Sequence, residues 1–175
     1  MTKKSIGLVG GGSWATAIAR LLVDNRHQIN WWVREAEIKD YFEKYNHNPL
    51  YLSSVQFDKT KVNIELDIKS VIESSDIVIF CYPSPFIYEL LSGLDANLFT
   101  DKYIVSAIKG LVPQTGEIIT DFFQSRFGIS PVNMAVISGP SHAEEVAGEK
   151  LTYLTIATQN NKLASHLSAL ISSRF

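Results

Sequence analysis

A glycine-rich turn near the start of the chain is the segment best suited to binding a charged ligand. Gly10-Gly11-Gly12-Ser13-Trp14-Ala15 fits the pattern G-x-G-x-x-G/A, between a strand-like apolar run and a helical pattern. In such a turn Gly10 permits the tight bend, Gly12 lets the backbone approach a pyrophosphate, and Ala15 lets the helix pack close to a sheet. The free N–H groups at the helix start then face the negative charge. The alternative is a structural connection without a ligand.

The end of the next apolar run bears on which dinucleotide would bind. The chain continues there with Val33-Arg34-Glu35. An acidic residue at this place typically binds the ribose 2′-hydroxyl of NAD, whereas an arginine accommodates the 2′-phosphate of NADP. Arg34 therefore favours NADP, while Glu35 keeps NAD open. The alternative is that Arg34 is a solvated surface cation, as single arginines often are.

Two later segments offer groups for a substrate. Lys109 follows the apolar run 103–107, at the carboxyl end of a predicted strand, where open α/β sheets bind ligands. An ammonium group there can stabilise a developing alkoxide, although a plain surface lysine is the alternative. Gly139-Pro140-Ser141 also leaves a strand and enters a helix, so its N–H groups can hold an anion. Alternatively, Ser141 is only a helix N-cap with Glu144 at the capping-box position.

Short apolar runs and longer amphipathic patterns must position these groups, and they alternate along the chain. The patterns predict strands over residues 6–10, 27–33, 62–66, 76–82, 103–107, 134–138 and 151–157. They predict helices over residues 13–25, 35–45, 68–73, 83–94, 116–127 and 162–172, and a loop over 46–54. This alternation is typical of right-handed βαβ units. The predicted fold class is therefore α/β: a Rossmann-type, doubly wound, mostly parallel sheet with helices on both faces.

Composition narrows the function classes. With 46% hydrophobic residues the 175-residue chain can build a core, and its net charge of −2 gives no basic excess for nucleic acid. We expect no transmembrane segment, because no run of 18 apolar residues exists, and no signal peptide at residues 1–5. The single cysteine, Cys81, predicts a buried structural thiol and a cytoplasmic location. The sequence contains no cluster of Cys and His residues, so we predict no metal site.

Four segments together resemble the NAD(P)-dependent glycerol-3-phosphate dehydrogenases, in the expected order and over nearly the whole chain. The first and last are specific in combination. The segments are Gly10-Gly11-Gly12-Ser13-Trp14-Ala15-Thr16-Ala17, then Trp32-Val33-Arg34 with the later Asn48-Pro49-Leu50-Tyr51-Leu52, then Ser106-Ala107-Ile108-Lys109-Gly110-Leu111, and Ser138-Gly139-Pro140-Ser141-His142-Ala143-Glu144-Glu145-Val146-Ala147.

The resemblance implies an activity and a set of site residues. Members interconvert dihydroxyacetone phosphate and sn-glycerol 3-phosphate by hydride transfer with NAD(P)H, feeding glycerophospholipid synthesis. The resemblance implies that Lys109 is catalytic and close to both cofactor and substrate. It places further residues at the cofactor: Ser13, Trp14, Arg34, Phe86 and Ala143. It places two more at the substrate: Gly139 and Ser141.

The resemblance also implies a domain organisation. The family's N-terminal domain binds the cofactor, and a helical C-terminal domain completes the substrate site. The family's general acid/base lysine lies at the start of that helical domain, whereas this chain ends with Ser172-Ser173-Arg174-Phe175. We therefore expect residues 1–175 to be the cofactor-binding domain, inactive without the absent helical domain. A homodimer of the full-length protein is left open. Ala15, where many members have glycine, is a tolerated departure.

Two other functions remain open from the sequence. One is another two-domain reductase of the hydroxyacid or ketopantoate type, against which Ser13-Trp14 and the segment 139–143 argue. The other is a module that binds NAD(P)H to sense redox state without catalysis, which the fold alone does not exclude. Lys109 and the segment 139–143 discriminate here, because a sensor has no use for a substrate-side lysine and an anion site.

Overall fold

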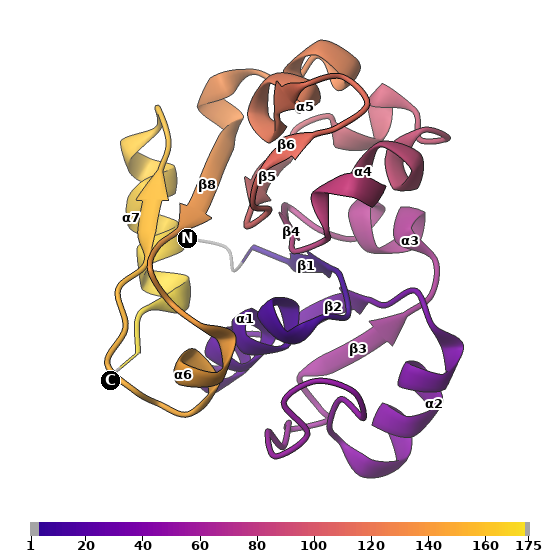
Figure 1. The fold of residues 1–175 in the computed structure, drawn as a ribbon, viewed down its shortest axis with the longest axis vertical. Coiled ribbons are helices and arrows are strands. Elements are labelled where there is room, and N and C mark those ends of the chain that lie inside the picture. The colour runs from indigo at the N-terminus through magenta and orange to yellow at the C-terminus, as the bar shows by residue number, and fades with distance from the viewer. Residues whose placement is uncertain (1–3, 174–175) are drawn as a thin grey trace.

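The computed structural model describes residues 4–173 and shows the predicted α/β architecture (Figure 1). The expectations for residues 1–3 and for Arg174 and Phe175 lie outside the described residues. A seven-stranded sheet has the order β3-β2-β1-β4-β5-β8-β9. Its strands are β1 (Ile6–Val9), β2 (Ile29–Trp32), β3 (Val62–Glu65), β4 (Ile77–Phe80), β5 (Tyr103–Ser106), β8 (Met134–Ser138) and β9 (Thr155–Ala157). All pairings are parallel except that of β9, which runs antiparallel to β8.

Helices cover both faces of the sheet. One hydrophobic cluster includes residues of α1 (Ser13–Asp24), α2 (Ala36–Tyr45), α6 (Ala143–Ala147) and α7 (Asn161–Ile171). The other includes residues of α3 (Ile68–Glu73), α4 (Ser84–Leu91) and α5 (Ile119–Phe127). Short 3₁₀ turns occupy Ala96–Phe99 and Pro131–Asn133. No helix among residues 4–173 is long and apolar enough to cross a membrane.

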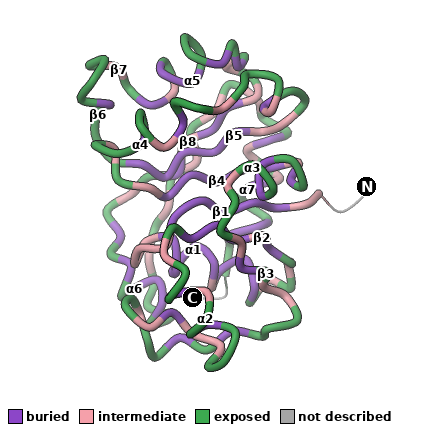
Figure 2. The backbone as a smooth tube through the Cα atoms, turned by 90° about the vertical axis from the view of Figure 1, so that its right-hand side faces the viewer, coloured by how far each residue is buried: buried purple, intermediate pink, exposed green. Residues whose placement is uncertain are grey.

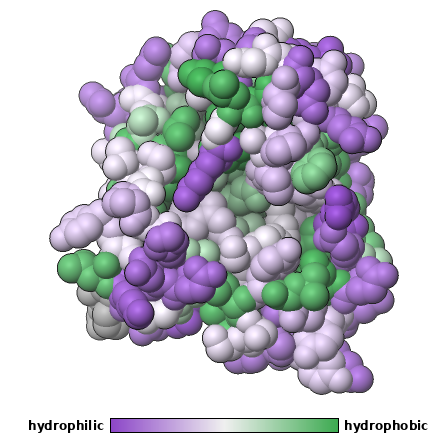
Figure 3. All heavy atoms as spheres, in the orientation of Figure 1, coloured by the Kyte–Doolittle hydropathy of each residue, from purple (hydrophilic) through white to green (hydrophobic). Residues whose placement is uncertain are grey.

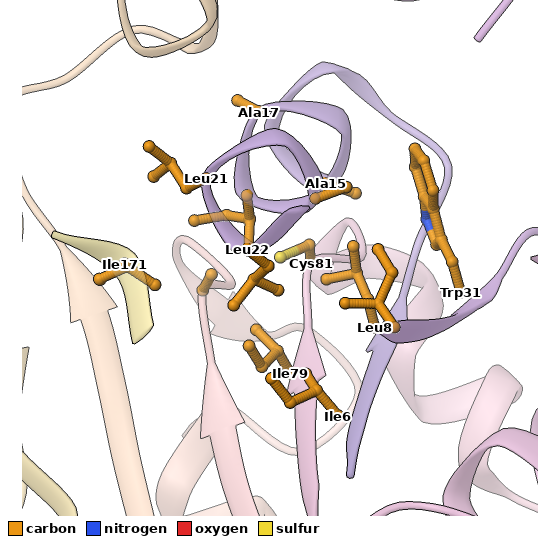
Figure 4. Packing of buried hydrophobic residues seen from close by; sticks show 14 of the residues in the cluster. Ile6, Leu8, Ala15, Ala17, Leu21, Leu22, Trp31, Ile79, Cys81 and Ile171 are labelled. Carbon is orange, nitrogen blue, oxygen red and sulfur yellow. The ribbon is translucent and has the colours of Figure 1, made fainter. Parts of the chain in front are cut away.

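Alternating side chains of the central strands build the two clusters. In β4, Ile77 and Ile79 belong to the cluster beneath α1, whereas Val78 and Phe80 face the opposite helices. Successive strand residues point to opposite faces, so a run that is apolar throughout is buried on both sides. Trp31 and Trp32 divide between the two clusters in the same way. Figure 2 shows the buried backbone concentrated in these strands, and Figure 4 shows α1 packed over them.

The segment before α5 differs from the prediction. The sequence predicted a helix over residues 116–127, but α5 begins at Ile119. The preceding residues form a small antiparallel hairpin of β6 (Leu111–Val112) and β7 (Glu117–Ile118). Its turn closes at Gly116, which has φ +70° and whose N–H donates to the Val112 carbonyl oxygen. Two-residue strands are too short to leave a recognisable alternation of apolar and polar residues.

The last strand is also shorter than predicted. The sequence predicted a strand over residues 151–157, whereas β9 contains only Thr155–Ala157. Leu151 and Tyr153 are each 72% exposed, so their side chains are not packed against a sheet. The Tyr153 carbonyl oxygen accepts a hydrogen bond from the Ser141 hydroxyl instead of joining a strand ladder. Apolar residues therefore extended the predicted strand beyond the paired segment.

The order of the strands creates a crevice. From β1 the chain winds outward to β2 and β3, and from β4 it winds in the other direction to β5 and β8. The loops that leave β1 and β4 therefore diverge to opposite sides at their carboxyl ends. Open α/β sheets bind ligands in the crevice at such a switch point.

Candidate functional site

A cleft of about 670 Å³ lies at the carboxyl ends of the central strands. Its walls come from the loops after β1, β2, β4, β5 and β8, which are far apart in sequence. Figure 3 shows the hollow near the centre of this face. Most of the expected site residues line the cleft: Gly12, Ser13, Trp14, Arg34, Phe86, Lys109, Ser141 and Ala143. Gly10 and Gly139 lie outside the lining.

Gly10 shapes the turn from behind the cleft. Its φ is +129°, and a Cβ there would lie 2.2 Å from the Cys81 carbonyl oxygen. Its own carbonyl oxygen accepts a hydrogen bond of 2.6 Å from Trp31 Nε1. Only glycine fits this backbone conformation and this close approach of two loops. The turn thus depends on glycine here for its geometry.

Gly12 has the opposite environment. It has an ordinary φ of −80°, and a Cβ built on it meets nothing within 4 Å. It is the N-cap of α1, which consequently has no side-chain cap. The first N–H groups of a helix lack intrahelical partners and carry a partial positive charge. A bare backbone, open space and free N–H groups fit the pyrophosphate of a dinucleotide.

Arg34 and Glu35 form one wall of the cleft together. Arg34 Nε donates to Glu35 Oε1 over 2.8 Å, and Arg34 Nη2 lies 2.7 Å from the same oxygen. The hydrogen bond to Glu35, aided by Tyr82, raises the pKa of an arginine that is charged in any case. The Arg34 side chain is 64% exposed, so the guanidinium is accessible to a ligand. The two residues that favour different cofactors in the sequence are therefore bound to each other.

Phe86 and Lys109 approach the cleft from neighbouring loops. Phe86 belongs to α4, after β4, and its side chain is 53% exposed. Lys109 follows β5 and precedes Gly110, whose φ of +89° turns the chain. Among the described residues Lys109 takes part in none of the ion pairs. An apolar ring and an uncompensated cation thus border the cleft together.

The segment after β8 departs from one interpretation of the sequence. Ser141 is not the N-cap of α6: that residue is His142, which provides no side-chain cap. The Ser141 hydroxyl donates to the Tyr153 carbonyl oxygen over 2.9 Å and is buried. Gly139 has φ +151°, and a Cβ there would lie 2.5 Å from the same carbonyl oxygen. The capping-box interpretation was therefore wrong, and both residues fix the approach of the segment around Tyr153.

Two acidic residues lie near the start of α6, and the cysteine is buried as predicted. Glu144 and Glu145 lie in the first turn of α6. Cys81 is buried, and that burial raises the pKa of its thiol, which stays neutral. No group of three or more His, Cys, Asp or Glu side chains within residues 4–173 is arranged to hold a metal ion.

Asn48 had no predicted role beyond its place in the resemblance. Its side chain is completely buried and donates to the Gly11 carbonyl oxygen over 2.9 Å and to Thr16 Oγ1 over 3.0 Å. An Asn-Pro pair in a loop signals only the start of a turn. The contact with the glycine turn spans 37 positions, so no local pattern could have revealed it.

Comparisons with known proteins agree with this geometry. Residues 5–164 match the family described as NAD-dependent glycerol-3-phosphate dehydrogenase N-terminus. The chain belongs to this family. A glycerol-3-phosphate dehydrogenase of Pseudomonas fluorescens that takes NAD(P)+ is 30% identical over 173 residues, covering 98% of this chain and 49% of the relative. The name of a second relative, from Pseudomonas syringae and 29% identical, also gives NAD(P)+ as its cofactor.

Solved structures show the same domain. The crystal structure of glycerol-3-phosphate dehydrogenase from Coxiella burnetii superposes with a TM-score of 0.88 at 27% identity, covering 98% of this chain and 52% of that one. An imine reductase from Pseudomonas sp. superposes with a TM-score of 0.69 at 15% identity, covering 98% and 54%, which shows the fold alone. The chain spans about half the length of the relatives that it matches.

Proposed function

We propose that the protein containing this chain interconverts dihydroxyacetone phosphate and sn-glycerol 3-phosphate, using NADPH or NADH. The carrying observation is that one cleft joins the open glycine turn, Lys109 and the loop at Ser141. A dinucleotide site alone needs only the first of these. A cation and a second loop on the same cleft provide for a small anionic substrate as well.

In this proposal the residues after β1 and β2 hold the dinucleotide. The N–H groups at the start of α1, next to Gly12, bind the pyrophosphate. Ser13 and Trp14 line the cleft directly beyond it. Arg34 meets a 2′-phosphate, and Glu35 meets a ribose 2′-hydroxyl when that phosphate is missing. Support comes from the position of both side chains on the cleft wall.

Lys109 is the proposed catalytic residue. A bound nicotinamide supplies the hydride for this chemistry. The ammonium group of Lys109 donates a hydrogen bond to the substrate oxygen and stabilises the negative charge that develops there as the ketone is reduced. Phe86 borders the same part of the cleft and helps to exclude water from it. The missing ion pair of Lys109 among the described residues supports this role, since the charge stays available for a ligand.

We also propose a second domain and a cellular role. Relatives about twice as long as this chain support a further, helical domain that completes the substrate site and brings the general acid/base lysine. Ser141 and Gly139 would then act on the substrate by holding their loop at the cleft. A reducing, cytoplasmic setting suits a protein whose single cysteine is a buried thiol. The product would feed glycerophospholipid synthesis.

Turnover by the full-length protein tests this proposal. Dihydroxyacetone phosphate should cause oxidation of NADPH or NADH, followed by absorbance of the reduced nicotinamide. Lys109→Met should lower kcat by about 10²–10³-fold, as expected for loss of a group that stabilises transition-state charge. Lys162→Met, on the exposed surface of α7, is the matched control and should act like wild type. Nucleotide binding without any turnover would favour the redox-sensing module instead.

A further inference from the structure

Asn48 lies at the centre of a buried hydrogen-bond network between two walls of the cleft. Its Nδ2 donates to the Gly11 carbonyl oxygen and to Thr16 Oγ1. The Thr16 hydroxyl donates in turn to the Gly12 carbonyl oxygen over 3.0 Å. The amide is 0% exposed and does not line the cleft itself. A side chain that touches no cleft space thus binds the Gly11 carbonyl directly and the Gly12 carbonyl through Thr16.

These contacts also set the direction of the N–H groups that face the cleft, because the peptide bond is planar. In a trans peptide the carbonyl of one residue and the N–H of the next point in opposite directions. Fixing the Gly11 carbonyl inward on Asn48 therefore aims the Gly12 N–H outward. Fixing the Gly12 carbonyl on Thr16 does the same for the Ser13 N–H. Gly11, Gly12 and Ser13 all line the cleft, so outward is toward the ligand.

The other side of the same amide holds a second wall. Asn48 Oδ1 accepts the N–H of Leu50 over 3.0 Å and that of Tyr51 over 3.2 Å. Leu50 and Tyr51 line the cleft beside the glycine turn. All the hydrogen-bonding groups of this amide are directed at backbone or hydroxyl groups of segments that border the ligand. A buried polar side chain would be costly here if it only filled space.

We propose that Asn48 is a positioning residue that aims the N–H groups of the glycine turn at the dinucleotide pyrophosphate. This inference rests on the proposed function, because it deepens the account of the same site. Asn48 acts through Gly12 and Ser13 and makes no contact with the cofactor. Thr16 extends its reach by one peptide unit. Their loss should weaken ligands with a pyrophosphate and spare ligands without one.

Binding of two nucleotides by the full-length protein separates positioning from mere stability. NADPH contains a pyrophosphate, whereas 2′-AMP carries the adenosine and 2′-phosphate without it. Asn48→Asp retains the acceptor for Leu50 and Tyr51 but loses the donor to Gly11. We expect Asn48→Asp to weaken NADPH about tenfold, which equals ~1.4 kcal/mol, and 2′-AMP less than about twofold. Thr16→Val should weaken NADPH by a smaller factor, and Thr16→Ser should restore wild-type binding.

A matched control separates a loss of stability from a loss of N–H orientation in the glycine turn. Asn160 caps α7 by accepting the N–H groups of Lys162 and Leu163, away from the cleft. Asn160→Ala should lower the stability of the protein to denaturant and leave the NADPH to 2′-AMP affinity ratio unchanged. An NADPH to 2′-AMP affinity ratio that Asn48→Asp leaves unchanged would overturn the proposal.

A readout without cofactor distinguishes failure of the inference from failure of the proposed function. Backbone NMR of the ligand-free protein reports the Gly12 and Ser13 amides directly. Their resonances and exchange rates should shift in Asn48→Asp and stay unchanged in Asn160→Ala. If wild type binds no dinucleotide, the proposed function fails, and these amides still decide whether Asn48 orients the turn. Unshifted amides would refute the positioning role, whatever binds.

Discussion

Two glycines of the same turn should respond in opposite ways to the same substitution. Gly10→Ala places a methyl group 2.2 Å from the Cys81 carbonyl oxygen and forces alanine to φ +129°. Gly12→Ala places a methyl group where no atom lies within 4 Å, at an ordinary φ of −80°. The first variant should lose stability, and the second should lose dinucleotide binding while remaining folded.

The magnitudes follow from the geometry. A strained backbone region costs ~1–3 kcal/mol, and overpacking a buried contact costs ~1–3 kcal/mol more. Gly10→Ala should thus lose about 2–6 kcal/mol of unfolding free energy. At Gly12 the lower entropy of the unfolded alanine chain offsets the poorer N-cap, so stability should stay within ~1 kcal/mol of wild type. Its methyl group occupies the approach to the pyrophosphate, and NADPH affinity should fall by at least about tenfold.

Urea unfolding and a titration with NADPH measure both quantities on each variant. The reasoning would be refuted by a Gly12→Ala variant that binds NADPH like wild type, because the open space at Gly12 would then not be ligand space. A Gly10→Ala variant as stable as wild type would show that the two loops do not need their close approach.

Three further predictions concern the rest of the chain. Burial of Cys81 and the raised pKa of its thiol predict slow alkylation of the native protein by iodoacetamide at pH 9. They also predict that the free energy of unfolding falls as the pH rises above the ordinary pKa of a thiol, because the unfolded chain then ionises more easily. Hydrogen bonds from the Ser5 N–H and hydroxyl lower the pKa of Asp76, so this carboxylate stabilises the fold above its ordinary pKa of 3.8, and that contribution is lost as the pH falls below it. Ser5→Ala removes the hydroxyl and should make the free energy of unfolding fall less steeply in acid, measured by urea unfolding as a function of pH. Gly139→Ala should destabilise the protein by at least about 1–3 kcal/mol in urea, because its Cβ would lie 2.5 Å from the Tyr153 carbonyl oxygen at φ +151°.

The fold was predictable where long, regular patterns carry it. The fully apolar run of β4 is typical of a strand buried on both faces, and the glycine turn marks the start of α1. The predicted bounds of both elements lie within two residues of the observed ones. The hairpin of β6 and β7 was missed, and β9 was predicted too long, because two or three residues set no periodicity. Their pairing depends on partners elsewhere in the chain.

The site was predictable in part for the same reason. Strand ends in a parallel sheet meet at one edge, so Arg34, Lys109 and the glycine turn could be expected near one another, and all border the cleft. The alternative that Ser141 is only a cap was wrong, because its hydroxyl donates to a carbonyl oxygen 12 residues away instead of accepting from the local N–H groups. The role proposed for Asn48 could not be predicted, since it depends only on contacts with residues far away in the sequence.

Calorimetric titration of the full-length protein with NADPH and NADH tests whether the cleft binds a dinucleotide. We expect saturable, single-site binding. We further expect Arg34→Ala to weaken NADPH more than NADH, because the 2′-phosphate loses its cation. Equal weakening of both nucleotides would keep the site and remove Arg34 as the discriminating residue. A folded protein that binds neither nucleotide would contradict the account.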